Sequence, residues 1–328
     1  MRKVLGSFVL AMVAGCGNGP AVTTSLDPPL AGQGFQLKVP EFTVNVGDEV
    51  QACFFFAVPG TPGTDVWVNH YDVAQPVGSH HMNIFRVKTI KNLSGNPGDS
   101  VVSKNGMGEC FVSSNWADWP LVVNSQDASR VDWKLPDGVG AKFQAGELLM
   151  LQTHWVNAVT QKTPAKASVS ANFYTMAAAP PNELGTLFAT NQNIRICPGD
   201  MDISFTKTCK FGDAPINVVA ANGHFHSRGK LFEIMATDPA GAVLDKFYTS
   251  TSWDDPPMTR DFTQVIPGGG GVQWTCTYDF PPNSCGGEID KMTGQPTCCY
   301  DFGGIVETKE HCNAFVYYWP KVQDVNCF

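Results

Sequence analysis

Short alternations of hydrophobic and polar residues recur along the chain and predict β-strands. Residues 35–39 and 42–46 alternate in this way on either side of Pro40, and residues 169–173 do so again. On a strand, alternate side chains face opposite sides, so each run offers one apolar face to a core. Clusters of Gly, Pro and Asp separate the runs, and no long amphipathic helix is visible. The pattern predicts an all-β chain built from antiparallel sandwiches.

One segment is suited to link two such sandwiches. Residues 177–182 read Ala-Ala-Ala-Pro-Pro-Asn, which suits neither a strand nor a helix. They separate residues 33–177 from residues 178–328, and each part has the size of an ordinary sandwich domain. We expect two tandem, jelly-roll-like domains.

The N-terminus indicates export. Two basic residues and a short apolar run precede Val-Ala-Gly-Cys at positions 13–16, which resembles a bacterial lipobox. This predicts removal of residues 1–15, lipidation of Cys16 and a tether over 16–32. The alternative is an ordinary signal peptide with an incidental cysteine. With the lipobox, the protein is held in the bacterial cell envelope, at the outer membrane or facing the periplasm, through lipid alone.

Charge and cysteine content narrow the possible functions. The 328 residues carry a formal charge of −8, and no basic patch argues for nucleic-acid binding. Of the 11 cysteines, one is assigned to the lipid, so ten remain for as many as five disulfides. None stands in the paired C-x-x-C spacing of a zinc site, which favours disulfides. The ten are Cys53, Cys110, Cys197, Cys209, Cys276, Cys285, Cys298, Cys299, Cys312 and Cys327.

The seven histidines are distributed unevenly. His70 stands alone in a loop-like stretch, where we expect a surface or capping residue. His224 and His226 are two apart and can share one face of a strand and one metal ion. His80 and His81 are adjacent, so they can converge only at a bend, which Gly78–Ser79 could supply.

Each half then holds three candidate ligands. The complete set is His80, His81 and His154 in the first half, and His224, His226 and His311 in the second. Neutral imidazole suits Cu, Zn, Fe and Ni, whereas a set poor in carboxylates disfavours Mg and Ca. Three ligands with an open fourth position are typical of a catalytic metal.

Around these histidines the chain resembles the copper type II, ascorbate-dependent monooxygenases, the family of peptidylglycine α-hydroxylating monooxygenase and dopamine β-monooxygenase. The motifs that carry the resemblance are H-H-M at 80–82, L-P-D-G-V-G at 135–140, L-Q-T-H-W at 151–155, H-F-H-S-R-G at 224–229 and E-H-C-N at 310–313. They follow the family's order and cover nearly all of the chain after the predicted leader.

The resemblance implies two packed β-sandwiches with a solvent-filled cleft and two copper ions per chain. One copper, at His80, His81 and His154, would store and deliver an electron from ascorbate or another one-electron reductant. The other, at the catalytic residues His224, His226 and His311, would bind O2 and attack a C–H bond. Gln152 would support the first site, with plain strand packing as the alternative.

The resemblance also implies three disulfides, which are Cys53–Cys110, Cys276–Cys312 and Cys209–Cys327. It leaves open the pairing of Cys197, Cys285, Cys298 and Cys299. The adjacent Cys298 and Cys299 would bond to each other only with strain, so we expect separate partners.

The chain departs from the family at the oxygen site, where His311 stands in place of a methionine. A third imidazole is a harder ligand than a thioether, so it should stabilise Cu(II) and lower the potential. We therefore expect altered or reduced monooxygenase reactivity. The alternative is that another methionine, such as Met292, supplies the sulfur.

A second departure concerns the substrate. Asn222 and Phe315 replace an Arg and a Tyr that hold the substrate carboxylate in the peptide-amidating branch, while Asn313 is kept. Without the guanidinium, bidentate carboxylate binding is lost, so peptidylglycine is not the expected substrate. These three residues are the predicted substrate pocket, for a neutral or aromatic molecule.

The sequence therefore predicts a copper oxidoreductase that hydroxylates a small molecule with O2 and an external reductant, and acts as a monomer. The alternative is a non-catalytic, copper-binding surface lipoprotein, which the third imidazole favours. A purely structural sandwich would leave the histidine pattern unexplained.

Overall fold

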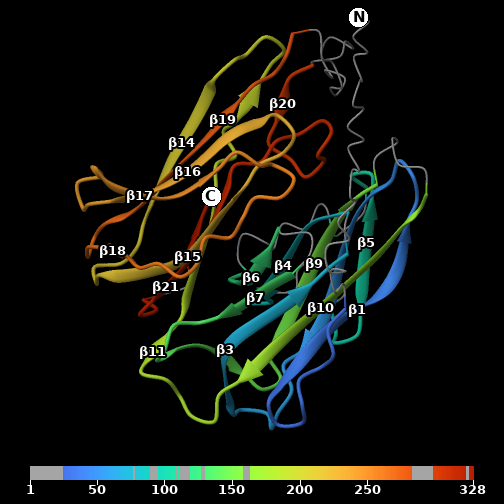
Figure 1. The fold of residues 1–328 in the computed structure, drawn as a ribbon, viewed down its shortest axis with the longest axis vertical. Coiled ribbons are helices and arrows are strands. Elements are labelled where there is room, and N and C mark those ends of the chain that lie inside the picture. The colour runs from blue at the N-terminus through green and yellow to red at the C-terminus, as the bar shows by residue number, and fades with distance from the viewer. Residues whose placement is uncertain are drawn as a thin grey trace, which may run out of the picture.

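The computed structural model describes residues 25–76, 78–88, 95–107, 110, 119–126, 130–157, 163–282, 298–322 and 325–328. The predicted leader, Cys16, Cys285 and Met292 lie outside these residues. The described part holds twenty-two strands in five sheets, and the all-β prediction is confirmed (Figure 1). No helix in this part is long and apolar enough to span a membrane.

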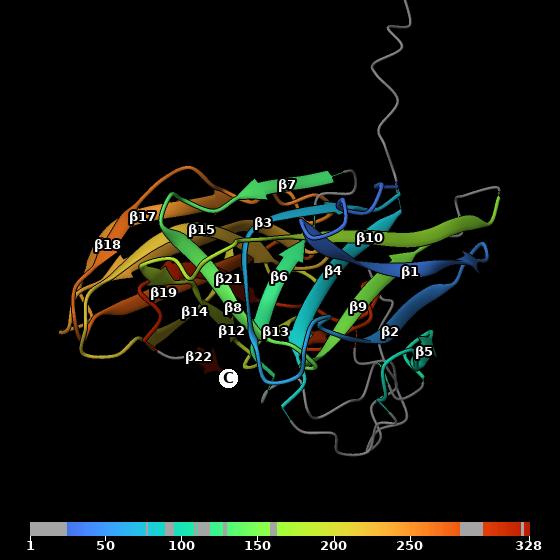
Figure 2. The same ribbon diagram turned by 90° about the horizontal axis from the view of Figure 1, so that it is seen from below.

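The first half of the chain is a sandwich of two sheets, which Figure 2 shows as separate layers. One sheet has the order β1 (Gly34–Val44), β10 (Ala165–Thr175), β3 (Asp65–Ala74), β8 (Val139–Gln144) and β11 (Asn182–Glu183), with β7 (Arg130–Lys134) also on β3. The other has the order β5 (Ser100–Lys104), β2 (Glu49–Ala57), β9 (Leu148–Val156), β4 (Ser79–Arg86) and β6 (Leu121–Ser125).

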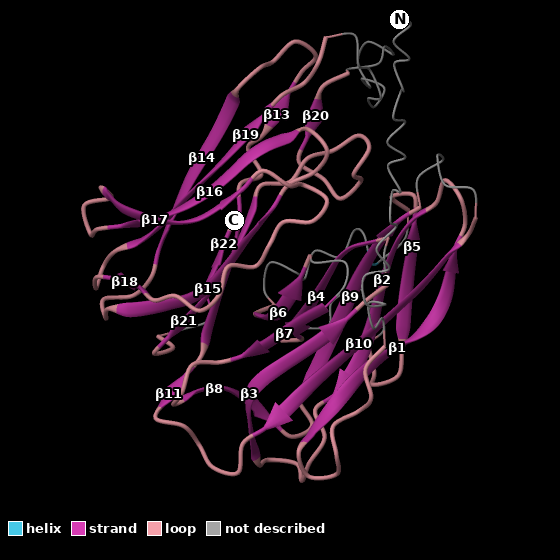
Figure 3. Ribbon diagram, viewed as in Figure 1, coloured by secondary structure: helices cyan, strands magenta, loops and turns pink. Residues whose placement is uncertain are grey.

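The second half is built in the same way (Figure 3). One sheet has the order β18 (Gln264–Ile266), β15 (Ile216–His224), β21 (Asn313–Trp319), β12 (Gly185–Thr190) and β22 (Val325–Cys327). The facing sheet has the order β14 (Ile203–Lys210), β19 (Gly271–Tyr278), β16 (Gly229–Thr237) and β17 (Val243–Ser250). A short pair joins β13 (Arg195–Ile196) to β20 (Tyr300–Asp301).

The alternating pattern of the first strands becomes one continuous strand. β1 pairs with β10 so that Leu37 lies opposite Ala171, and both are buried. The register shifts between Val39 and Phe42, so β1 continues past Pro40 instead of ending there. Proline lacks the N–H that a regular ladder needs, and a bulge at this point accommodates it.

Strand pairing changes from the first half to the second within a few residues. β11 pairs parallel with β8 of the first half, whereas β12 begins at Gly185 and pairs with β21 of the second. The first apolar core continues across this boundary onto Phe188, Phe315 and Tyr317. The two halves are therefore in direct contact beside the histidines.

Four disulfides tie the described chain together. They are Cys53–Cys110, Cys197–Cys299, Cys209–Cys327 and Cys276–Cys312. Three of them are the pairs that the resemblance implies, and the fourth gives Cys197 a partner. Cys298 is also disulfide-bonded, and Cys299 is bonded to Cys197, so these adjacent cysteines have separate partners, as expected.

Candidate metal centre

Six histidines from both halves of the chain come together in one group, which we call the histidine cluster; five are buried and His311 is partly buried. Its members are His80, His81, His154, His224, His226 and His311. Ring centroids of His80 and His81 lie 4.8 and 4.9 Å from that of His224, so the contact crosses the boundary between the sandwiches. The seventh histidine, His70, is apart from the cluster.

His80 and His81 converge because β4 bulges where it begins. The pairing of β4 with β9 skips His80, between Ser79 and His81, and Gly78 just before has a φ of +100°. Glycine adopts that left-handed conformation without strain. The bulge turns two adjacent side chains to one side, as the predicted bend requires. His154 then lies opposite His81 on β9.

His224 is the last residue of β15, and His226 follows in the turn before β16. Their ring centroids are 5.1 Å apart, while Phe225 between them is buried in the second core and stacks on Phe232. A side chain at Gly229 would collide with the ring of Phe225, so glycine permits this tight turn. The H-x-H pair shares one side as predicted, although the strand ends at its first histidine.

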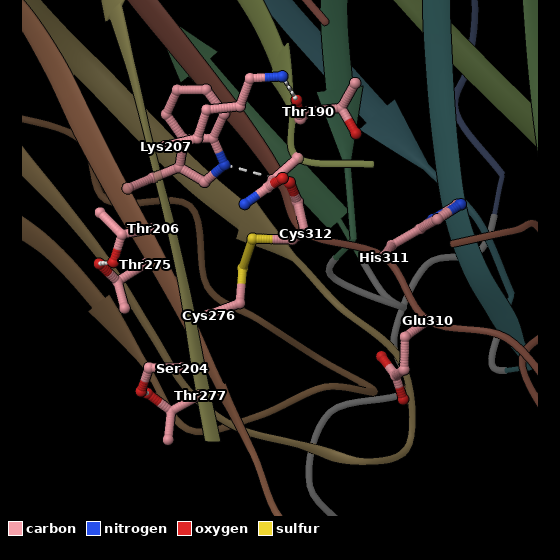
Figure 4. Close-up of a disulfide and its surroundings, with 12 residues drawn as sticks. Thr190, Ser204, Thr206, Lys207, Thr275, Cys276, Thr277, Glu310, His311 and Cys312 are labelled. Atoms are coloured by element: carbon pink, nitrogen blue, oxygen red, sulfur yellow. Dashed lines mark hydrogen bonds between the residues drawn. A yellow bond between two sulfur atoms is a disulfide. The ribbon is translucent and has the colours of Figure 1, made fainter. Parts of the chain in front are cut away.

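A neighbouring disulfide and two hydrogen bonds hold His311 in place. Cys312 is bonded to Cys276 of β19, and Figure 4 shows the ring of His311 extending away from that disulfide. The hydroxyl of Tyr278 donates to the carbonyl oxygen of His311 at 2.6 Å. The Nδ1 of His311 lies 3.0 Å from the Nε2 of His224.

Hydrogen bonds select the tautomers of three histidines. Nδ1 of His224 donates to Oε1 of Gln126 at 2.7 Å, and Nδ1 of His226 donates to the carbonyl oxygen of Lys309 at 3.0 Å. In each ring the lone pair therefore lies on Nε2. Nε2 of His154 donates to Oε1 of Glu49 at 2.8 Å, which places its lone pair on Nδ1.

Several buried nitrogens have no hydrogen-bond partner in the protein, namely Nε2 of His80, Nδ1 of His81 and Nε2 of His226. Buried polar atoms are normally satisfied, so these nitrogens point to a ligand that accepts lone pairs. Metal–nitrogen bonds of about 2.0–2.1 Å place neighbouring ligand nitrogens about 3.0–3.4 Å apart. The spacing of 3.0 Å between His224 and His311 fits such a site.

Burial keeps the imidazoles neutral. It lowers the pKa of His80, His81, His224 and His311 well below 6.5, with a further contribution from neighbouring histidines. Burial also lowers the pKa of His226, to about 3. Neutral imidazole is the form that binds a metal ion.

The ligand atoms form two groups that share His224. One is His80, His81 and His224, the other is His224, His226 and His311, and the nitrogens of each lie within 4.8 Å of one another. The second group is the triad expected in the second half. The first differs from the expected triad, because His224 reaches across the boundary whereas the Nε2 of His154 is turned to Glu49. His154 still contacts both partners, with ring centroids 5.2 Å from His80 and 4.9 Å from His81.

Three residues beside the cluster were not identified from the sequence. Glu49 holds His154, and Gln126 holds His224, but each lies far from its histidine along the chain. Glu310 is fully buried and accepts from the backbone N–H groups of His226 at 2.8 Å and Arg228 at 2.7 Å. Burial raises the pKa of Glu310 to about 8, and these backbone hydrogen bonds oppose that rise. Its place directly before His311 was the only available signal.

A cavity of about 300 Å³ adjoins the cluster and is lined by His81, His224 and His311. Two of the three predicted pocket residues, Asn313 and Phe315, line it, and so does Gln152. Asn222 does not line it and is fully buried within β15.

Gln152 lies beside the first group, as expected. Its Oε1 accepts from Nδ2 of Asn83 at 2.9 Å, and a contact with Gln152 opposes the lowering of the pKa of His81. His70, by contrast, lies within β3 and not in the expected loop, because its segment pairs with β10 and β7. Its Nε2 is 2.5 Å from Oδ1 of Asp132.

Comparison with known proteins gives no family. No family model and no curated protein matches the chain. PNGase F, a glycosylasparaginase from Flavobacterium meningosepticum, is similar over 88% of this chain and 98% of that chain, with 9% identity and a TM-score of 0.38. The tandem CBM22 domains of Paenibacillus barcinonensis Xyn10C are similar over 85% of this chain and 82% of that chain, with 9% identity and a TM-score of 0.22. Likenesses this weak carry no argument about function.

Proposed function

We propose that the protein is a copper-dependent oxidoreductase that hydroxylates a C–H bond of a small molecule. The observation that carries this proposal is the set of buried, unpartnered imidazole nitrogens of His80, His81 and His226. They lie beside a cavity that His81, His224 and His311 line. Two groups of candidate ligands meet at His224, whose one lone pair can serve one copper ion. The resemblance to the ascorbate-dependent monooxygenases suggests both the metal and the reaction. In the balanced reaction, one atom of O2 enters the C–H bond and the other leaves as water, with two electrons and two protons from ascorbate or another one-electron reductant.

The donor set fits copper. All ligands in both groups are imidazoles, and no carboxylate belongs to either group among the described residues. Imidazole suits copper, and a site without carboxylate oxygens disfavours Mg and Ca. Bound copper would supply electron transfer and oxygen activation.

The chain's own residues would position the ligands and the substrate. Gln126, Lys309 and Glu49 fix which nitrogen of His224, His226 and His154 carries the lone pair. Such outer hydrogen bonds orient metal ligands and raise their basicity. The cavity would place the substrate against His81, His224 and His311, which line it.

A second function, copper binding without catalysis, is favoured by His311. Three imidazoles stabilise Cu(II) more than two imidazoles and a thioether, which slows reduction. In either case Cys16 and the segment before it support a lipid-anchored protein of the bacterial cell envelope. Mass analysis of the N-terminal peptide tests that anchor, because an unmodified Cys16 contradicts it.

Oxygen consumption separates the two functions. Copper-loaded protein is mixed with ascorbate, and O2 uptake is followed with an electrode. The enzyme should consume O2 faster than free copper at the same concentration in the presence of a chelator for unbound metal. A His224→Ala, His226→Ala double variant is the matched control. If bound copper is retained but uptake equals that of the control, the non-catalytic function holds.

A further inference from the structure

The cavity beside the histidine cluster is lined by amide side chains that are not fully hydrogen-bonded. Five of them, Gln51, Asn83, Gln126, Gln152 and Asn313, are at least nine-tenths buried. Each has one polar atom with no partner in the protein. A buried polar atom left unsatisfied is costly, so this concentration of them in one cavity indicates a ligand that satisfies them.

These unpartnered polar atoms, which we call the open atoms, comprise both donors and acceptors. Oε1 of Gln126 accepts from His224 and Oε1 of Gln152 accepts from Asn83, so both glutamines present Nε2 as a donor. Asn83 uses its Nδ2 in that bond and presents Oδ1. The open atoms of Gln51 and Asn313 are also oxygens. A ligand with one acceptor and N–H donors, such as a carboxamide, would satisfy atoms of both kinds.

Flat aromatic rings form the apolar part of the wall. Phe188 and Phe315 stack with centroids 5.2 Å apart and planes inclined by only 4°, and Phe85 lies 6.0 Å from Phe188. Offset stacking or edge contact with such rings favours a planar, aromatic ligand. The volume of about 300 Å³ is at the small end of the range for small-molecule sites.

In the metal-free protein, no acidic or basic side chain of the cavity offers a counter-ion. Among the described residues that line it, none is Lys, Arg, Asp or Glu. A charged ligand would therefore lose its hydration without gaining an ion pair, which disfavours both carboxylates and ammonium groups.

From these observations, we infer that the cavity binds an uncharged aromatic molecule bearing a carboxamide-like group. As a statement about the substrate it rests on the proposed function, but the binding itself does not need the metal.

Three ring compounds of similar size, one neutral, one anionic and one cationic, test whether the cavity prefers an uncharged ligand. Metal-free protein is titrated with benzamide, benzoate and benzylammonium, and binding is followed by calorimetry or NMR. Benzamide should bind at least about 10-fold more tightly than either ion, the difference expected for burying an unpaired charge. Equal or tighter binding of benzoate or benzylammonium overturns the inference, and so does no binding of benzamide at about 10 mM.

Variants test the place of binding. Asn313→Leu and Asn83→Leu each remove one open acceptor and should weaken benzamide binding about 5-fold or more. Gln264→Leu changes a glutamine on β18, outside the cavity, and should leave it unchanged. Unchanged binding in both cavity variants, once their melting temperatures show that they fold, overturns the assignment to this cavity.

The two proposals fail separately. Benzamide binding by protein that retains no copper would support this inference and contradict the proposed function. Protein that retains copper but binds benzamide no better than the ions would contradict only this inference.

Discussion

The imidazole of His224 is held by the amide of Gln126, with Nδ1 and Oε1 2.7 Å apart. Gln126 follows β6 of the first sandwich, whereas His224 ends β15 of the second. A second contact across the boundary lies two residues before Gln126. The hydroxyl of Tyr317, on β21, donates to Oδ1 of Asn124 at 2.6 Å and accepts from the backbone N–H of Asn124 at 2.8 Å. The orientation of this candidate ligand therefore depends on how the two halves pack together.

Gln126→Leu should weaken copper binding without unfolding the protein. The change removes the acceptor that fixes the tautomer of His224, and loss of such a contact costs about 10- to 100-fold in metal affinity. Competition with a chelator of known affinity measures the effect. Gln264→Leu, on β18, is the control, and equal affinities of both variants would show that Gln126 does not orient the ligand.

Glu310→Ala should destabilise the metal-free protein. The buried carboxylate accepts from the backbone N–H groups of His226 and Arg228, and the change would leave both donors unsatisfied. At about 1–3 kcal/mol for each such group, the free energy of unfolding should fall by about 2–6 kcal/mol. Urea unfolding of the apo protein measures it.

Two variants control that experiment. Glu310→Gln keeps one acceptor oxygen, so its free energy of unfolding should fall less than that of Glu310→Ala. Glu41→Ala removes a carboxylate that is 61% exposed and should change stability by less than about 0.5 kcal/mol. A loss for Glu310→Ala as small as that for Glu41→Ala would contradict the role given to Glu310.

His311→Met should raise the reduction potential of bound copper and alter its Cu(II) spectrum. A thioether is a softer and weaker ligand than imidazole and favours Cu(I). Electron paramagnetic resonance and redox titration measure these changes, with Met235→Leu, on β16, as a control for altered methionine content. An unchanged spectrum would show that His311 is not a ligand.

The metal-free protein should lose stability as the pH falls below about 6.5. Burial lowers the pKa of His80, His81, His224 and His311 well below 6.5 and that of His226 to about 3, so the unfolded chain takes up protons that the folded chain does not. The stabilising effect is complete above the unfolded pKa and is lost as the pH falls toward the folded values.

Urea unfolding in a chelator, from about pH 7.5 to about pH 5.5, checks this dependence. His70→Asn should keep the same dependence, because His70 lies outside the cluster on β3. Stability that stays constant or rises over this range would contradict burial of the rings as neutral groups.

The sequence predicted the elements that local patterns encode. Alternation gave the strands that form the first core, such as Val169 opposite Val39, and the spacing of His224 and His226 predicted that their rings share one side. It could not predict contacts set by the packing of the two halves. Gln126 and Glu49 are ordinary polar residues in the sequence, and only the fold brings them to histidines 98 and 105 residues away.

Packing also explains the difference in ligand grouping. A division by halves assigns His154 to His80 and His81, because β9 and β4 are neighbours in one sheet. Such a division cannot predict that His224, at the end of β15, contacts His80 and His81 from the other sandwich. Nor can it predict that one nitrogen of His154 donates to Glu49.

The copper content of the purified protein tests the central claim most directly. Protein prepared under copper-replete conditions and freed of loosely bound metal should retain two copper ions per chain. Because the single lone pair of His224 serves one ion only, one ion would rest on His224, His226 and His311 and the other on His80, His81 and the adjacent His154. The His224→Ala variant should retain less, since it loses a ligand of the site with His226 and His311. Wild-type protein that retains no copper, or a variant that retains as much as the wild type, would contradict the account.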